Sequence, residues 1–194
     1  MLRLRVFYKK EGVAIFISEK NFQKNIERIL RRMELPLKFT EGFSPHPKIS
    51  FGHPLPIGIT GLNECFDVFL TREIDVASFI ERSRDLLPEG ITFFSARWID
   101  VASPSISSRE TFARYIIEVA EDIDVRHFQK MGKVIEYTGK NIVLLIKINS
   151  FSHKELIGLF LEGKIKSIMR EIINGGIPRS HILPIEGEDI GGGG

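Results

Sequence analysis

Lysines and arginines recur between residues 20 and 32 at three- and four-residue spacings, which gather side chains on one side of a helix. At ~100° per residue they span about 120°, and the apolar Phe22, Ile26 and Leu30 fall on the opposite side. The cationic side chains are those of Lys20, Lys24, Arg28, Arg31 and Arg32. A guanidinium presents a planar fork of donors that suits phosphate oxygens. The pattern therefore indicates either a site for phosphates or an acidic partner surface, or an ordinary solvated helix face.

The segment that follows, residues 42–58, reads GFSPHPKISFGHPLPIG. Its prolines fix φ and its glycines permit backbone conformations closed to other residues, so a stiff loop is expected that loses little entropy on binding. Such a frame would present Ser44, His46, Lys48 and His53 as polar groups. We predict that these four side chains and the five cations of the helix face one groove, which binds a nucleic acid or a partner protein.

The histidines of this loop raise two further possibilities. His46 could act as a general acid or base near neutral pH, with Arg31 and Lys48 stabilising charge on a phosphate, but no nucleophile or carboxylate accompanies it in the sequence. His46 and His53 also lack a third ligand at helical or hairpin spacing, so no metal site is expected. A catalytic role for His46 stays an alternative to pure binding.

Charge is distributed unevenly along the chain. Residues 1–58 contain 11 Lys and Arg against 5 Asp and Glu, a net +6, whereas residues 59–194 contain 16 against 20, a net −4. The single cysteine, Cys65, excludes an internal disulfide, a cysteine-rich zinc site and an iron–sulfur cluster within this chain. Its strand-like surroundings, ECFDVFL, indicate a buried structural thiol, and we expect the chain to hold no cofactor.

The elements that must position these residues follow a recognisable order. Alternation in RLRVFYKK predicts a strand, VAIFIS at 13–18 predicts a second strand that closes a hairpin, and Ser18 is a good N-cap for a helix over about 19–33. Further strands are expected at PKISF, ECFDVFLT and ITFFSARWI, with a helix after Asp75, and Trp98 in the core. With the opening hairpin counted as one element, the order through residue 100 is βαββαβ, that of a ferredoxin-like fold.

The rest of the sequence predicts a second, degraded copy of the same order. Residues 101–110, VASPSISSRE, are typical of a linker, and beyond them we expect a strand, a short helix, a hairpin around Gly139, and a helix capped by Ser152. IKSIMREII at 165–173 predicts one more helix, NGGIP a loop, HILPIE a weakly extended segment and GGGG a flexible tail. We therefore predict an α+β protein with a basic ferredoxin-like half at 1–100, a linker at 101–110, and a second half with the tail at 111–194.

No apolar run approaches the ~20 residues of a membrane-spanning helix, and the N-terminus does not have the apolar core of a signal peptide. We expect a cytoplasmic protein without a membrane partner.

The run FISEKNFQKNIERILRRMELPLKFTEGFSPHPKISFGHPLPIG resembles the radical-SAM-linked protein family, whose reaction is uncharacterised. The shared positions include Phe16, Ile17, Ser18, Glu27, Arg28, Leu30, Arg31, Arg32, Leu35, Pro36, Gly42, Phe43, Pro45, His46, Pro47, Ser50, Phe51, Leu55, Pro56 and Gly58. Glu19, Lys20 and Asn21 stand where members usually have histidine, leucine and aspartate. The resemblance implies that the chain is an accessory of a radical SAM protein. Genes of this family lie in neighbourhoods that include ribonucleases, which implies that the accessory acts on RNA.

The order of the first elements also resembles, more faintly, that of the tRNA pseudouridine synthases. This likeness implies a similar way of holding RNA. The catalytic aspartate of those enzymes has no counterpart in this sequence. The leading hypothesis is a non-catalytic module that recognises tRNA-like RNA for a radical SAM partner. The alternatives are an RNA-processing or RNA-modifying enzyme that uses His46, and a protein-interaction domain that docks on the radical SAM protein.

Overall fold

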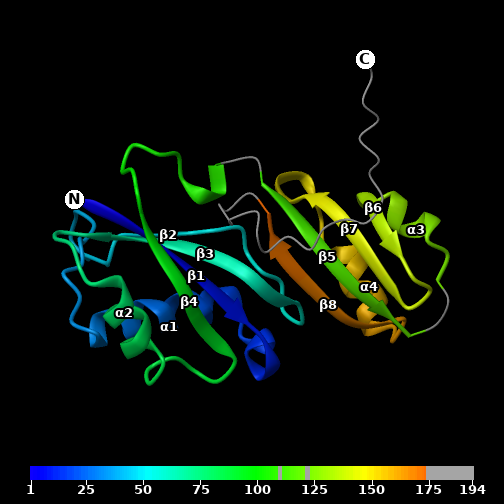
Figure 1. Ribbon diagram of the computed structural model, residues 1–194, viewed down its shortest axis with the longest axis horizontal. Coiled ribbons are helices and arrows are strands. Elements are labelled where there is room, and N and C mark those ends of the chain that lie inside the picture. The colour runs from blue at the N-terminus through cyan, green and yellow to red at the C-terminus, as the bar shows by residue number, and fades with distance from the viewer. Residues whose placement is uncertain (109–110, 121–122, 174–194) are drawn as a thin grey trace, which may run out of the picture.

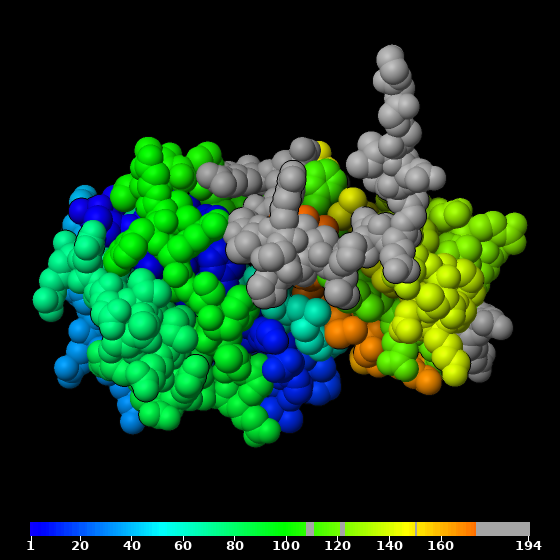
Figure 2. Space-filling model, in the orientation of Figure 1, coloured from blue at the N-terminus to red at the C-terminus, as the bar shows by residue number. Residues whose placement is uncertain are grey.

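In the residues that the structure describes, the protein has a mixed α/β fold with eight strands in one mixed sheet (Figure 1). The computed structural model describes residues 1–108, 111–120 and 123–173, and within these residues it has four α-helices. The main path of the sheet runs β4-β1-β3-β8-β5-β7-β6, and β2 pairs with β3 beside this path. Figure 2 shows the two halves side by side, with the N-terminal elements in blue to green at one end and the later elements in yellow at the other.

In the first half, two helices cover one face of the sheet. Its elements are β1 (Leu2–Lys10), α1 (Glu19–Arg32), β2 (Ile49–Phe51), β3 (Thr60–Leu70), α2 (Val76–Ser83) and β4 (Ile91–Ile99). The alternation in β1 sends Leu4, Val6 and Tyr8 into the core, where they pack with Phe22 of α1 and Phe79 of α2. Both β3 and β4 pair antiparallel with β1, so the N-terminal strand is central to this half.

The opposite face of β1 is also buried. Arg3 and Arg5 are each 3% exposed, and both donate to Asp67, which is 0% exposed. Residues from the predicted linker cover this face: the Arg3 guanidinium donates to the carbonyls of Ser103 and Pro104, and Ile106 packs against Phe7 and Cys65. The segment after β4 is thus attached to the sheet.

The second half has the same succession of elements. They are β5 (Phe112–Val119), α3 (Arg126–Gln129), β6 (Lys133–Tyr137), β7 (Asn141–Lys147), α4 (Lys154–Leu161) and β8 (Ile165–Ile172). All strand pairs within this half are antiparallel. Its core includes Tyr115, Phe128, Leu144 and Leu156, together with Leu55 from the proline-rich loop of the first half.

The two halves meet where β3 pairs with β8, the parallel pairing in the described part of the sheet. Arg170 of β8 forms a two-point ion pair with Glu64 of β3, at 2.8 and 2.6 Å. Its guanidinium also donates to the carbonyls of His53 and Pro54, both at 2.9 Å. Arg170 is 0% exposed and Glu64 3%, so a buried charge pair joins the halves.

The predicted strand at 13–18 is wrong, because the chain forms a 3₁₀-helix there, η1 (Gly12–Phe16). Its Val, Ile and Phe content favours a strand, but Gly12 takes φ +55°, in the left-handed region, and redirects the chain out of β1. Ala14 fills the core, and the Ile17 amide donates to the Ala14 carbonyl. The opening hairpin is therefore absent, and Phe16 is exposed.

Three further expectations are also wrong. The predicted helix at 165–173 is strand β8, because it has hydrogen-bonding partners on both sides, β3 and β5. Helix α4 is capped at His153 and not at Ser152. Trp98 is 37% exposed because it lies on β4, a strand at the edge of the sheet.

The predicted NGGIP loop, the extended HILPIE segment and the GGGG tail lie outside the described residues. No helix in the part of the chain that the structure describes is long and apolar enough to span a membrane.

Candidate nucleic-acid interface

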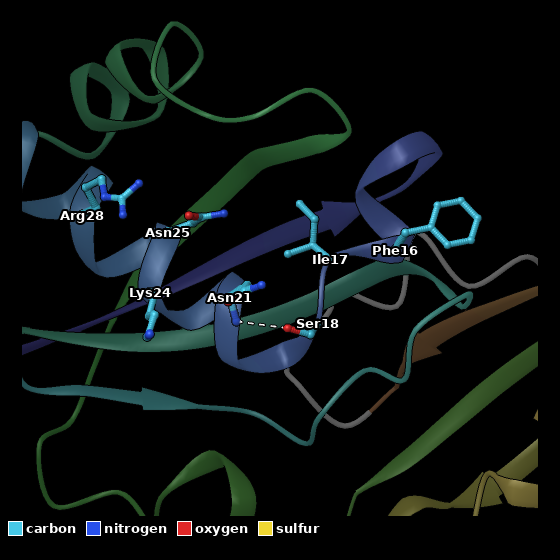
Figure 3. A pocket seen from close by; sticks show the side chains of 7 residues that line it. All are labelled: Phe16, Ile17, Ser18, Asn21, Lys24, Asn25 and Arg28. Atoms are coloured by element: carbon cyan, nitrogen blue, oxygen red, sulfur yellow. Dashed lines mark hydrogen bonds between the residues drawn. The ribbon is translucent and has the colours of Figure 1, made fainter.

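Helix α1 presents its cations to solvent because its other side is fixed in the core. Phe22, Ile26 and Leu30 are at most 1% exposed and pack on the sheet. The Ser18 hydroxyl caps the helix by accepting from the Asn21 amide at 3.4 Å (Figure 3), as predicted. All five predicted cations are exposed: Lys20, Lys24, Arg28, Arg31 and Arg32.

One acid borders this cationic face and connects it to the loop. Glu27 forms an i,i+4 ion pair with Arg31 at 3.0 Å, and its Oε1 lies 3.6 Å from Nδ1 of His46. The Arg31 guanidinium also lies over the Phe39 ring, 5.1 Å from its centroid. Among the residues described, the other four cations of α1 have no ion pair. Helix and loop therefore meet at Glu27, a carboxylate beside His46 that sequence reasoning missed.

The start of the loop, together with the two residues before it, forms a hairpin tip at residues 40–46. The Thr40 amide donates to the His46 carbonyl at 2.8 Å, and the His46 amide donates to the Thr40 hydroxyl at 3.0 Å. Gly42 has φ +122°, which other residues rarely adopt. Ser44 and His46 are exposed on this tip, and the Phe43 side chain is 110% exposed.

The structure separates the other two predicted loop residues from this tip. The Lys48 ammonium lies over the Phe69 ring, 4.8 Å from its centroid, and 3.9 Å from Sδ of Met1. His53 follows β2 and lies at the junction of the halves, where its carbonyl accepts from Arg170. The structure thus brings Ser44 and His46 to the end of α1 that carries Arg31, and places His53 elsewhere.

An open hollow of about 600 Å³ lies over the first turns of α1 (Figure 3). Its lining consists of Phe16, Ile17, Ser18, Asn21, Lys24, Asn25 and Arg28. In Figure 3 the Phe16 ring stands at one end of this row and Arg28 at the other. The cations can hold phosphates, and the two amides can both donate to and accept from a base. Sequence reasoning missed Asn21 and Asn25, although their i,i+4 spacing beside the cations is the signal for them.

A second hollow, of about 440 Å³, lies at the junction of the halves, where Glu19, His53, Ile57, Phe151 and His153 contribute to its wall. Burial, with the nearby Arg170 charge, lowers the pKa of His153 to about 4. Its Nε2 lies 2.5 Å from the Tyr115 hydroxyl, whose pKa burial raises to about 12. A neutral imidazole that accepts from a protonated phenol fits these values.

Cys65 is 4% exposed, which confirms its predicted burial, and burial raises its pKa to about 12, so its thiol stays protonated. No group of three or more His, Cys, Asp or Glu side chains within residues 1–108, 111–120 and 123–173 could hold a metal ion.

Comparison with known proteins gives one family. Residues 3–157 match the family described as "Uncharacterized protein conserved in bacteria (DUF2344)". No curated protein matches the chain. The match includes α1, the hairpin tip and most of the second half, which is more than half of the sequence. The chain therefore belongs to the DUF2344 family of proteins conserved in bacteria.

Proposed function

We propose that this protein is a non-catalytic module that binds RNA of a tRNA-like kind through α1 and the hairpin tip, and holds it for a radical SAM partner. The observation that carries this proposal is the set of five exposed cations on one face of α1, beside a stiff hairpin. Glu27 is the acid that contacts this surface, and it occupies Arg31 and His46 at one border. Lys20, Lys24, Arg28 and Arg32 remain available for phosphates.

The charge distribution supports a polyanionic ligand. The +6 of residues 1–58 is displayed partly on α1, whereas Arg3 and Arg5 are buried against Asp67 and contribute little to the outer surface. The cations of α1 are therefore a main source of positive potential on this half. Phosphate binding to such a surface releases counterions, which makes affinity depend steeply on salt.

The strand neighbours support two ferredoxin-like halves. Across the sheet, the strands of the first half lie in the order β4-β1-β3-β2, and those of the second half in the order β8-β5-β7-β6. If the four strands of each half are numbered along the chain, both halves have the same spatial order, 4-1-3-2. This is the arrangement of a split βαβ fold. The second copy is then more complete than its sequence pattern indicates, since β8 supplies its fourth strand.

A radical SAM partner is proposed from the sequence resemblance. A cytoplasmic location is proposed because no apolar run of the sequence approaches the ~20 residues of a membrane-spanning helix. The single buried cysteine is consistent with a separate radical SAM partner, because an iron–sulfur cluster needs several thiolates and another chain would have to supply them.

Salt-dependent titration with tRNA tests the RNA-binding function. The variant R28A/R31A/R32A should weaken binding and lower the slope of log affinity against log salt by about 1.4 to 1.8, at ~0.7 to 0.9 for each of Arg28 and Arg32, the two arginines without an ion pair in the described residues. Its control is K130A/K133A/K140A, which removes the same charge from exposed positions of the second half and should bind nearly as the parent does. No binding at low salt, or equal losses in both triple variants, would refute the proposal.

His46 beside Glu27 favours a second candidate, an RNA-processing or RNA-modifying enzyme. A carboxylate 3.6 Å from Nδ1 could orient the imidazole for proton transfer. Incubation with total tRNA should then yield fragments or altered nucleosides with the parent but not with H46A. Equal product from both proteins would exclude this role for His46.

A further inference from the structure

Two aromatic side chains are exposed at opposite ends of the cationic face of α1. Phe16, 64% exposed, precedes the helix and lines the hollow that also contains Lys24 and Arg28. Phe43, 110% exposed, lies on the hairpin tip. The tip meets the last turns of α1 through the contact between His46 and Glu27. An aromatic ring therefore stands near each end of the row of cations.

The contacts that close the hairpin tip do not involve the exposed Phe43 ring. The tip is closed by the two hydrogen bonds between Thr40 and His46, and below it Phe39 forms a β-bridge with Pro47. Phe39 is the aromatic residue of this hairpin that contacts the helix, under the guanidinium of Arg31. Phe43 is thus held on a fixed backbone without a packing partner of its own.

We infer that the ligand of α1 is a single-stranded RNA segment, with one unpaired base stacked on Phe43 and another on Phe16. The inference rests on the proposed function and names its substrate class. Exposed aromatic rings beside a cationic groove are how proteins hold single strands, since every base has a face that can stack. In a duplex the base faces already stack on each other and are not available to a protein ring.

The dimensions and the polar groups between the rings suit such a segment. Helix α1 has 14 residues, which at ~1.5 Å each is about 21 Å. This is the length of about six nucleotides at the ~3.4 Å spacing of a stacked strand, and of fewer nucleotides in an extended one. Lys24 and Arg28 would neutralise phosphates along this path. Asn21 and Asn25, which line the same hollow, could hydrogen-bond to base edges.

The test compares an unstructured 12-nucleotide RNA with a duplex of the same sequence and a 4-nucleotide RNA. The parent should bind the 12-nucleotide strand at least tenfold more tightly than either of the others. F43A should lose about tenfold for the single strand and less than twofold for the duplex, and F16A about threefold for the single strand. F43W should keep the affinity, and its added indole fluorescence should be quenched when RNA binds.

The control is Y137A, which removes an exposed aromatic ring from β6 in the second half and should leave both affinities unchanged. If the duplex binds as tightly as the single strand, or if F43A and Y137A behave alike while R28A/R31A/R32A still weakens binding, the inference is wrong and the proposed RNA-binding function stands. If neither RNA binds at low salt, both fail. If Phe43 is needed only to retain a protein partner, the ring is a docking residue and the inference is likewise wrong.

Discussion

Arginines occupy two contrasting settings in this protein. Inside the sheet, Arg3, Arg5 and Arg170 are at most 3% exposed, and each is paired with a buried carboxylate. On α1, Arg28 and Arg32 are exposed, and the described residues give them no carboxylate partner. The same side chain thus joins parts of the fold in one region and is available to a ligand in the other.

The difference follows from the cost of removing a charge from water. A buried guanidinium without a partner is expensive, so each one in the sheet has an acceptor for its donors. An exposed guanidinium keeps its hydration and can exchange water for phosphate at little cost. Variants of the buried pairs should therefore change stability strongly, and variants of α1 should change binding with little effect on stability.

Asp67→Ala should give the largest loss of stability. The Asp67 carboxylate accepts from Arg3 at 2.7 Å and from Arg5 at 2.8 and 3.0 Å. Its removal leaves two buried guanidinium groups facing each other, which should lower the free energy of unfolding by about 3–5 kcal/mol. Urea denaturation measures this loss. Asp67→Asn, which keeps the shape and an acceptor oxygen, should lose less, and equal stability of Asp67→Ala and the parent would show that these buried charges do not need the carboxylate.

Arg170→Met should be nearly as damaging, because it leaves Glu64 buried and unpaired at the junction of the halves. We expect a loss of about 3 kcal/mol in the free energy of unfolding, and the double variant R170M/E64M should recover much of it. A double variant that is less stable than R170M alone would contradict this account. Loss of the donors to the His53 and Pro54 carbonyls should also loosen the proline-rich loop, which hydrogen exchange would report.

His153→Gln should change how stability depends on pH. In the folded protein burial lowers the pKa of His153 from 6.5 to about 4. As pH falls below about 6.5, the unfolded chain takes up a proton that the folded chain does not, so stability falls until about pH 4. His153→Gln still offers Tyr115 an acceptor but does not titrate, so its denaturation midpoint should fall less between pH 6.5 and 4. At pH 8 the two proteins should be equally stable, and parallel profiles across the acid range would be the contrary result.

Sequence patterns predicted the strands that alternate and the helix that is capped. They identified β1, β3, β4 and the β6–β7 hairpin, and they found α1 within one residue of its observed end, because period and capping are local properties. They failed at 13–18 and at 165–173. Gly12 turns the first segment away from the sheet. The second segment has apolar residues at helical spacing, and it is a strand because it forms ladders with two distant strands.

The part of the candidate site that lies on α1 was predictable, because helical period is a local property of the sequence. The exposed cations of α1 follow from helical period alone. The position of His53 depends on Arg170, which is 117 residues away in the sequence, and the contact of Glu27 with His46 depends on how the hairpin folds back on the helix. Long-range pairings of this kind leave no local pattern, and so the sequence placed Ser44, His46, Lys48 and His53 on one surface that the structure divides.

Glu27→Gln should have the smallest effect on stability and should change RNA binding instead. The Glu27–Arg31 pair is exposed, with 32% and 44% of the side chains accessible, so its loss should cost at most about 0.5 kcal/mol. The same change removes the acid that borders the cationic face and frees Arg31 and His46, so affinity for single-stranded RNA should rise about twofold to threefold at low salt. Titration beside Glu81→Gln, which removes an acid from α2, separates a local effect from one of net charge. Weaker RNA binding by Glu27→Gln would mean that Glu27 acts by holding Arg31 and His46 in place. The surface ion pair would then fix the positions of its side chains, as the buried ion pairs of the sheet do.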